Sequence, residues 1–333
     1  MKVLVAGSGG WGTALSLVLL RNGHEVTLWS YCREESEQLA ARRNNPFLPG
    51  ITLPQELGLT ADAAEARRMD MVVFATPSFA VRATAKTFAP YLTDETVLVS
   101  VTKGIEADTG SRMSELIVQE TGKTVVALSG PSHAEEVSRA IPTGVVAACA
   151  DKALAEHVQS AFMCTMLRVY TCPDIVGVEL AAAHKNVIAL CAGLSDGMGY
   201  GDNTKALLMT RGLAEVARLG MSLGAQRETF AGLAGVGDLI VTCTSMHSRN
   251  RRAGILIGQG LKAQEAMREV GSVVEGYYAA RAAWLLAQKQ GVEMPITQAA
   301  YEILYENRDP REAMSSLMLR QKTSETEDAA WAR

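Results

Sequence analysis

The start of the chain combines a short apolar run with four closely spaced glycines, and this pattern constrains the fold more than any other feature. Residues 2–6 lead directly into the spacing G-x-G-x-x-G, which is carried by Gly7, Gly9 and Gly12, with Gly10 and Trp11 between. Residues 13–21 have a helical composition, and a second apolar run covers 25–29. In such a unit the glycines permit a tight turn, room for a pyrophosphate and close helix packing. The order therefore predicts a dinucleotide site, with the phosphates at the helix N-terminus.

Length and composition narrow the class of protein. A chain of 333 residues is long enough for two domains, and 48% hydrophobic with 20% charged residues is typical of a globular protein. The net charge is −4 and no basic run alternates with aromatic residues, so we expect no nucleic-acid surface. We also expect no membrane span, which needs about 18 to 20 apolar residues. The glycine loop interrupts the N-terminal apolar run, which argues against a signal peptide.

The cysteines and histidines are dispersed. The six cysteines stand singly at positions 32, 149, 164, 172, 191 and 243, and none forms C-x-x-C. A chain of this size does not need disulfides, so we expect a reducing, cytoplasmic setting. The five histidines show no ligand spacing, and we therefore expect no metal site.

The first half alternates strand and helix signals. Further strands are expected at 71–75, 97–101, 124–128 and 144–148, and helices at 33–43, 81–92 and 111–121. Residues 44–50 contain two prolines and a glycine and must form a loop. This alternation predicts an α/β domain with a doubly wound, mostly parallel sheet.

The composition changes near Cys172-Pro173, where β-branched runs give way to segments rich in Ala, Leu, Met and Glu. Helices are expected at 175–194, 205–219, 263–269, 277–290 and 297–306. We therefore predict a dinucleotide-binding domain over 1–172, an all-α substrate domain over 173–323 and a loose tail over 324–333. Four apolar residues near the end suit either an interface or the core: Met314, Leu317, Met318 and Leu319.

Three predicted strands end in polar or glycine residues, at 75–78, 100–104 and 129–132. In an open α/β sheet, ligands bind outside the carboxyl ends of the strands. This position directs Lys103 toward the reactive end of a cofactor, although a lysine before a glycine is also common in a surface turn.

Lys185 lies in an apolar helical segment, 179–190, with few other charges. A buried ammonium is costly unless it is paired or loses its proton, so Lys185 suits a general acid/base. It can instead extend from the helix edge to water. Asn186 beside it suits the positioning of a polar substrate, whereas His184 is interpreted as structural. Asp238 lies within an apolar run and needs a cationic partner such as Lys185.

Residues 248–252 read Ser-Arg-Asn-Arg-Arg beside a predicted helix. Arginines and helix N–H groups together favour an anionic group such as phosphate, although a basic run is usually a solvated surface. A glycine-rich segment, 193–206, is too rich in glycine for simple scaffolding, but such turns are often structural.

Many short motifs in one order identify a resemblance that covers the chain from Gly7 to about Leu319. The sequence resembles the NAD(P)-dependent glycerol-3-phosphate dehydrogenases of the bacterial type. The motifs that carry the resemblance are Trp11–Ala14, Leu48–Ile51, Val101–Ile105, Leu128–Ser132, Lys185–Val187, Gly201–Asn203, Gly237–Leu239, Ser248–Asn250 and Val274–Gly276.

The resemblance implies a Rossmann domain, a helical substrate domain and a cleft between them. It implies interconversion of sn-glycerol 3-phosphate and dihydroxyacetone phosphate for phospholipid synthesis, in a homodimer. Lys185 is the implied proton acceptor, with Lys103, Asn186 and Asp238 beside it. The implied substrate contacts are Lys103, Gly130, Ser132, Asp238, Ser248, Arg249 and Asn250. The implied cofactor contacts are Gly10, Trp11, Lys103, Ala134, Arg249, Val273 and Glu275.

The chain departs from the family pattern at two places that concern the cofactor. Position 10 is Gly where the family often has Ser, and basic residues often follow the second strand where this chain has Ser30-Tyr31-Cys32-Arg33. A strict NAD enzyme usually has an acid at the strand end for the ribose hydroxyl, and none occurs here before Glu34. Tyr31 suits stacking on adenine, and Arg33 suits either a 2′-phosphate or solvent. We predict use of NADP(H) at least as readily as NAD(H).

Two alternative functions stay open. One is a related β-hydroxyacid or sugar-acid dehydrogenase, which would bind a carboxylate instead of a phosphate, and the cluster at 248–250 disfavours it. The other is a non-enzymatic redox sensor that binds the dinucleotide, and a buried Lys185 disfavours that.

Overall fold

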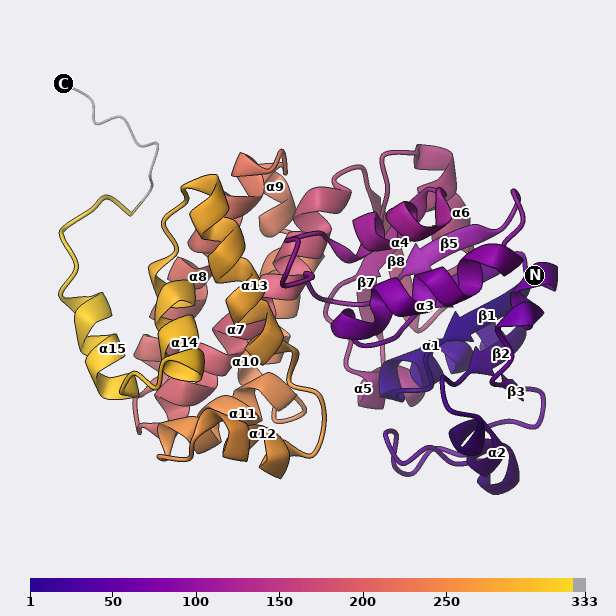
Figure 1. The fold of residues 1–333 in the computed structure, drawn as a ribbon, viewed down its shortest axis with the longest axis horizontal. Coiled ribbons are helices and arrows are strands. Elements are labelled where there is room, and N and C mark those ends of the chain that lie inside the picture. The colour runs from indigo at the N-terminus through magenta and orange to yellow at the C-terminus, as the bar shows by residue number, and fades with distance from the viewer. Residues whose placement is uncertain (326–333) are drawn as a thin grey trace.

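An eight-stranded sheet forms the centre of the N-terminal part of the chain. The computed structural model describes residues 1–325 (Figure 1). The strands run in the order β3-β2-β1-β4-β5-β6-β7-β8, and β7 pairs with β6 antiparallel while the other neighbours are parallel. Their bounds are β1 (Lys2–Ala6), β2 (Glu25–Trp29), β3 (Gly58–Thr60), β4 (Met71–Phe74), β5 (Val97–Ser100), β6 (Val125–Ser129), β7 (Thr143–Ala148) and β8 (Leu167–Cys172). The order reverses between β1 and β4, where doubly wound folds bind dinucleotides.

Helices cover both faces of this sheet. They are α1 (Gly10–Arg21), α2 (Arg33–Arg42), α3 (Val81–Phe88), α4 (Met113–Thr121), α5 (Ala134–Ser138) and α6 (Lys152–Phe162), with short 3₁₀ segments η1 (Ala63–Arg68), η2 (Ser78–Ala80) and η3 (Ala89–Tyr91). Val3 and Val5 of β1 pack in one core with α1 and α6, whereas Leu4 and Ala6 pack in the other core with α3 and α4. The strand is apolar on both faces because both faces are covered. The predicted α/β class is confirmed.

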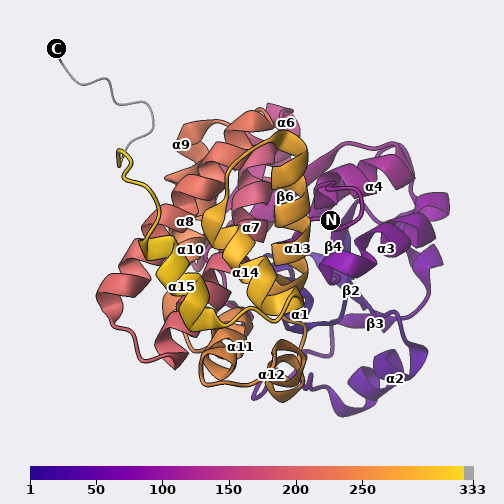
Figure 2. The ribbon, with the colours of Figure 1, turned by 60° about the vertical axis from the view of Figure 1, so that its left-hand side comes forward.

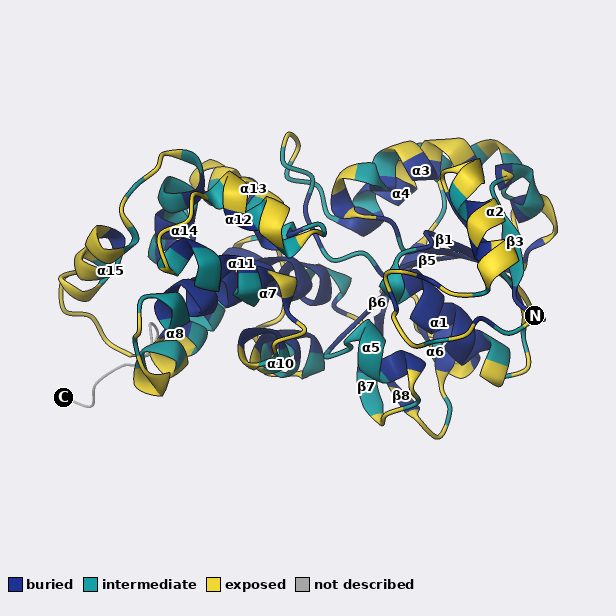
Figure 3. Cartoon of the chain, turned by 90° about the horizontal axis from the view of Figure 1, so that it is seen from below, coloured by how far each residue is buried: buried dark blue, intermediate teal, exposed yellow. Residues whose placement is uncertain are grey.

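The C-terminal part is all helical. It contains α7 (Ile175–Gly197), α8 (Asp202–Ser222), α9 (Arg227–Phe230), α10 (Asp238–Thr244), α11 (Arg249–Gly258), α12 (Ala263–Val270), α13 (Glu275–Gln290), α14 (Pro295–Tyr305) and α15 (Pro310–Met318), with a π-turn η4 (Leu233–Gly237) before α10. Helix α7 lies at its centre (Figure 3), and α14 and α15 lie on the side remote from the sheet (Figures 1 and 2). The view by burial shows α7 as almost entirely buried.

The length of α7 corrects the expectation that no apolar stretch could span a membrane. Among the described residues, α7 is the one helix long and apolar enough, and 227–244 with 249–258 pass the same test only as a bent pair. In α7, 89% of the apolar window is buried inside the protein. A helix that is apolar all round is typical of the core of a large protein.

Helices α7 and α11 cross with their backbones in contact. A Cβ atom on Gly193 would lie 2.1 Å from the carbonyl oxygen of Arg251, and one on Gly254 would lie 2.1 Å from that of Leu190. Gly197 and Gly258 meet the facing backbone in the same way. Gly193 and Gly197 thus have a packing role, which explains two of the four glycines in the segment 193–206.

The largest differences from prediction lie outside the long apolar segments. The sequence analysis predicts neither the short β3 nor the edge strand β8, and it does not predict the helices α5, α6, α9, α10 and α15. Met314 and Leu317 pack against the helical core, whereas Met318 and Leu319 are 64% and 85% exposed. Of the predicted tail, residues 326–333 lie outside the described part of the chain.

Candidate active site

The first glycine turn has the geometry that a pyrophosphate requires. Gly7 has φ +131°, and a Cβ there would lie 2.7 Å from the carbonyl carbon of Ala75. A Cβ on Gly12 would lie 2.0 Å from the carbonyl oxygen of Gly7. A Cβ on Gly9, by contrast, meets nothing within 4 Å, and Gly9 precedes the first turn of α1 without a side-chain cap. Open backbone before a helix N-terminus suits an anion.

Buried polar atoms without a partner gather at the carboxyl edge of the sheet. They include the hydroxyl oxygens of Ser30, Thr76, Ser100 and Ser129, which end or follow β2, β4, β5 and β6. Buried hydroxyls are normally hydrogen-bonded, so a group of exceptions at one edge indicates a ligand-binding region. Together with the glycine turn, these residues fit a dinucleotide.

The loop 44–50 explains the glycine at position 10. A Cβ on Gly10 would lie 2.7 Å from the carbonyl oxygen of Phe47, and 3.8 Å from the Cβ of Ala134. The side chain of Asn45 holds the loop there by donating to the carbonyl of Ser8 and the hydroxyl of Thr13, both at 2.7 Å. Trp11 lies in the same turn, partly buried, with its indole nitrogen unpartnered. Position 10 thus requires the smallest residue in this chain.

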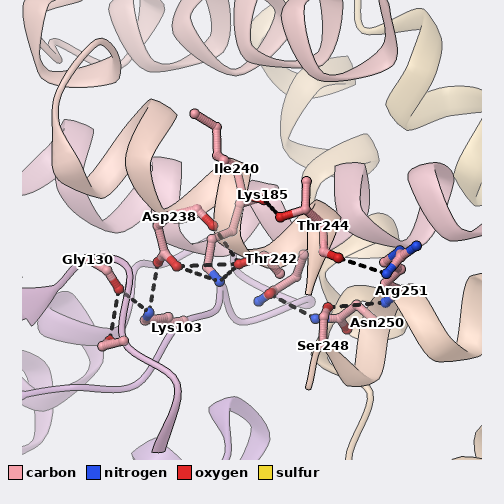
Figure 4. A network of polar contacts seen from close by, with 12 residues as sticks. Lys103, Gly130, Lys185, Asp238, Ile240, Thr242, Thr244, Ser248, Asn250 and Arg251 are labelled. Carbon is pink, nitrogen blue, oxygen red and sulfur yellow. Dashed lines mark hydrogen bonds and ion pairs between the residues drawn. The ribbon is translucent and has the colours of Figure 1, made fainter. Parts of the chain in front are cut away.

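Lys185 is buried in α7 with its ammonium group directed at α10. Its Nζ donates to the hydroxyl of Thr242 at 2.7 Å and lies 3.0 Å from Oδ1 of Asp238 (Figure 4). Burial lowers the pKa of Lys185 to about 8, and this effect outweighs Asp238, which raises it. The contact with Asp238 is the one the sequence predicts. A lysine with this pKa can both donate and accept a proton near neutral pH.

Asp238 lies between lysines from the two parts of the chain. Lys103, which follows β5, approaches Oδ2 of Asp238 at 2.7 Å and donates to the carbonyl of Gly130 at 2.9 Å. The hydroxyl of Ser132 donates to the same carbonyl at 2.8 Å. The structure therefore brings Lys103, Gly130 and Ser132 of the sheet domain to the carboxylate that also holds Lys185.

The first turn of α11 supplies the basic end of the site. Ser248 caps the helix, its hydroxyl accepting from the N–H of Arg251 at 3.2 Å, and Arg249 follows it, exposed. Asn250 is buried and donates to the amide oxygen of Asn186 at 2.9 Å. The N–H of Gly276 donates to Oδ1 of Asn250 at 2.8 Å. This chain joins α7, α11 and the start of α13 at one place.

Comparison with known proteins agrees with this geometry. The model of the NAD-dependent glycerol-3-phosphate dehydrogenase N-terminus matches residues 2–155, and that of the C-terminus matches 174–315. The chain belongs to the NAD-dependent glycerol-3-phosphate dehydrogenase family. It is 52% identical to the glycerol-3-phosphate dehydrogenase [NAD(P)+] of Pelotomaculum thermopropionicum, over 99% of this chain and 97% of the relative. The relative from a Thermoanaerobacter species is 51% identical, covering 98% of this chain and 99% of its own length.

A solved relative has the same fold throughout. The crystal structure of glycerol-3-phosphate dehydrogenase from Coxiella burnetii has a TM-score of 0.92 with this chain, at 37% identity. The match covers 96% of this chain and 99% of the other. The resemblance inferred from the sequence is thereby confirmed.

Glu275, at the start of α13, contacts the sheet part of the chain. Its carboxylate accepts from the backbone N–H of Ser78 at 3.2 Å and from the hydroxyl of Ser78 at 2.6 Å. Burial raises the pKa of Glu275. Val273 lies two residues earlier and is partly buried. The expected cofactor residue Glu275 therefore already contacts the segment that follows β4.

Tyr31 and Arg33 are not brought to the lysine centre. Both are exposed, Tyr31 at 86%, in the turn between β2 and the start of α2. This position, beside the end of β2, is where doubly wound folds bind the adenosine ribose. Their roles in cofactor choice stay predictions.

Three residues of the site were not found from the sequence. Thr242 lies one turn after Asp238 on α10, a spacing that a search for partners of Asp238 would have found. His133 follows Ser132, and its pKa is lowered by burial and by the nearby Lys185 ammonium. Ser78 closes the polar strand end 75–78, but only the fold shows its contact with Glu275.

Proposed function

We propose that the chain reduces dihydroxyacetone phosphate to sn-glycerol 3-phosphate, and catalyses the reverse reaction, with NADP(H) or NAD(H). The observation that carries this is the buried Lys185, whose pKa of about 8 and contacts with Thr242 and Asp238 suit proton transfer to a substrate oxygen. The bound nicotinamide supplies and accepts the hydride.

Lys185 gives its proton to the substrate oxygen during reduction and takes it back during oxidation. Lys103, held by Asp238 and Gly130, adds positive charge beside the oxygen as negative charge develops. The amide oxygen of Asn186 is committed to Asn250, so any contact of Asn186 with the substrate uses its nitrogen. Asp238 keeps both ammonium groups in one place.

The phosphate of the substrate binds at the first turn of α11. Arg249 provides a guanidinium there, Ser248 and Asn250 flank it, and the helix N-terminus adds its own positive end. Lys185 on α7 and Arg249 on α11 then hold opposite ends of a three-carbon substrate. A substrate that carries a carboxylate and no phosphate would not need this phosphate-binding site.

Several further properties belong to the same proposal. The cofactor domain comprises residues 1–172 and the substrate domain 173–323, since β8 ends at Cys172 and α7 begins at Ile175. The protein acts in the cytoplasm, as a homodimer, and its product feeds phospholipid synthesis, as the family resemblance implies.

The test is the oxidation of NADPH and NADH, followed by absorbance, with dihydroxyacetone phosphate as substrate. Parallel reactions use β-keto acids and the keto forms of sugar acids, which can accept the hydride, and Lys185→Ala serves as the matched variant. Turnover of the phosphorylated ketone that disappears in Lys185→Ala supports the proposal. Turnover of a carboxylate substrate alone would favour the sugar-acid enzyme, and cofactor binding without turnover of any substrate would favour the redox sensor.

A further inference from the structure

Arg251 ties together the three helices that carry the site, although it lies in the basic run that the sequence assigns to an anion. It donates from Nε and Nη2 to Oδ2 of Asp196, at 2.9 and 2.8 Å. Its Nη1 donates to the carbonyl of Thr244 at 2.8 Å, as Figure 4 shows. Asp196 lies at the end of α7, Thr244 ends α10, and Arg251 is in the first turn of α11. Within the run 248–252, the guanidinium of Arg251 is therefore bonded inside the protein, which leaves Arg249 as the arginine of the proposed anion site.

Lys205 completes this network from α8. Its Nζ lies 2.9 Å from Oδ1 of Asp196, so each carboxylate oxygen faces a different cation. The side chains of Asp196, Lys205 and Arg251 are only 14–17% exposed, so water screens their attraction little. Asp196 and Lys205 both lie in the glycine-rich segment 193–206, which therefore supplies two members of this network.

The connection between α10 and α11 is the part of the site that needs this support. The glycine contacts fix α7 against α11, and the segment 245–248 that joins α10 to α11 reads Ser-Met-His-Ser, so it contributes no glycine to that crossing. The bonds of Arg251 span this segment, from Thr244 before it to α11 after it. Asp196 in turn anchors Arg251 to the helix that carries Lys185.

We propose that Asp196, Lys205 and Arg251 form a positioning brace for substrate binding. The brace sets the place of Arg249 and its neighbours relative to Lys185, without touching the substrate. It acts on binding of the phosphate end and not on the proton-transfer step. This inference rests on the proposed function, which assigns the phosphate to the first turn of α11.

The test compares Asp196→Asn with Asp202→Asn. Asparagine keeps the size of Asp196 and removes its charge, whereas the side chain of Asp202 is 100% exposed and lies 3.5 Å from the same Lys205. In Asp196→Asn we expect KM for dihydroxyacetone phosphate to rise about tenfold or more, with kcat within about threefold of the parent, since misplacing a binding group by 1 Å costs about that much or more. Asp202→Asn should leave both KM and kcat within about twofold of the parent values, because an exposed ion pair contributes little.

Two further measurements separate positioning from general damage. The Kd of NADPH, measured by fluorescence, and kcat/KM for unphosphorylated dihydroxyacetone should not change in Asp196→Asn. If Asp196→Asn does not fold, Lys205→Met, which leaves Arg251 on Asp196, should raise KM for the phosphorylated substrate in the same direction by a smaller factor. KM for dihydroxyacetone phosphate should rise in Arg251→Met, and it should rise by a smaller factor in Arg251→Lys.

The brace is refuted if KM in Asp196→Asn matches that in Asp202→Asn, or if the loss falls equally on kcat, on NADPH binding and on the unphosphorylated substrate. Failure of the proposed function is distinguished at once, because the parent enzyme would then show no turnover of dihydroxyacetone phosphate.

Discussion

Replacing Asp238 with asparagine is expected to move the pH dependence of turnover to lower pH. Asp238 is buried between two ammonium groups, 3.0 Å from that of Lys185 and 2.7 Å from that of Lys103. Asparagine fills the same volume and still accepts a hydrogen bond. It removes the negative charge that favours the charged form of Lys185.

The size of the change follows from the geometry. Unit charges 3 to 4 Å apart attract by about 4 to 5.5 kcal/mol at an effective dielectric constant near 20. One pH unit corresponds to about 1.4 kcal/mol, so complete loss of this attraction would lower the pKa by about three to four units. The amide dipole retains part of this attraction. Burial already holds the pKa of Lys185 at about 8. We therefore expect a further decrease of about one to two pH units in Asp238→Asn.

The slope of kcat/KM against pH has opposite signs in the two reaction directions. Oxidation of glycerol 3-phosphate needs neutral Lys185, so kcat/KM rises with pH through the pKa of the free enzyme, whereas reduction needs the ammonium and falls through it. In Asp238→Asn both midpoints should move down together. The maximal rates should also fall, because Lys103 loses the same partner.

The assay is the pH profile of kcat/KM in both directions, with Lys103→Met as a control of opposite sign. The Lys103 ammonium lowers the pKa of Lys185, so its removal should move both midpoints to higher pH. Midpoints that stay in place in Asp238→Asn, or that rise, would refute the assignment of this pKa to Lys185 beside Asp238.

Four further predictions concern separate parts of the molecule. Lys185→Ala should lower kcat by about 10²- to 10⁴-fold while the melting temperature and the Kd of NADPH stay unchanged; a kcat within about threefold of the parent would exclude the acid/base role. Arg249→Ala should cost about 2 kcal/mol in binding of dihydroxyacetone phosphate, and an equal loss for dihydroxyacetone would show that Arg249 does not bind phosphate. The kcat/KM with NADPH should equal or exceed that with NADH, and a tenfold preference for NADH would contradict this; Arg33→Ala with unchanged NADPH kinetics would remove only the role of Arg33. Gly254→Ala should destabilise the fold by about 1 to 3 kcal/mol, seen as a lower unfolding midpoint, because its Cβ would meet the carbonyl of Leu190 at 2.1 Å; an unchanged midpoint would mean that α11 can shift.

The elements predicted well are those whose burial is uniform. The buried strands β4 to β7 were each found within one residue or two, because apolar runs bounded by turns are strong local signals. Edge strand β8 alternates buried and exposed residues, with Arg168 and Tyr170 facing out, and this short pattern was passed over. Helix α10 has seven residues, several of them β-branched, so its helical propensity is weak.

The sequence predicts those features of the site that depend on neighbouring residues along the chain. A lone lysine and a lone aspartate in apolar segments must be compensated, and this predicts the contact between Lys185 and Asp238. No local rule says that Lys103 reaches the same carboxylate from a distance of 135 residues. The roles within the basic run were equally hidden, because Arg249 and Arg251 are the same residue type and only the fold directs the second to Asp196.

If Lys185 and Arg249 hold opposite ends of the substrate as proposed, the backbone crossing of α7 and α11 would also limit how long a substrate can be. Lys185 lies on one of these helices and Arg249 on the other, and four glycines leave no side chain between them that could repack. A phosphorylated ketone with a longer carbon chain would need the two helices to spread, which would break contacts between main-chain atoms. In the proposed substrate site, chain-length selectivity would therefore rest on four glycines at the crossing of the two helices, Gly193, Gly197, Gly254 and Gly258.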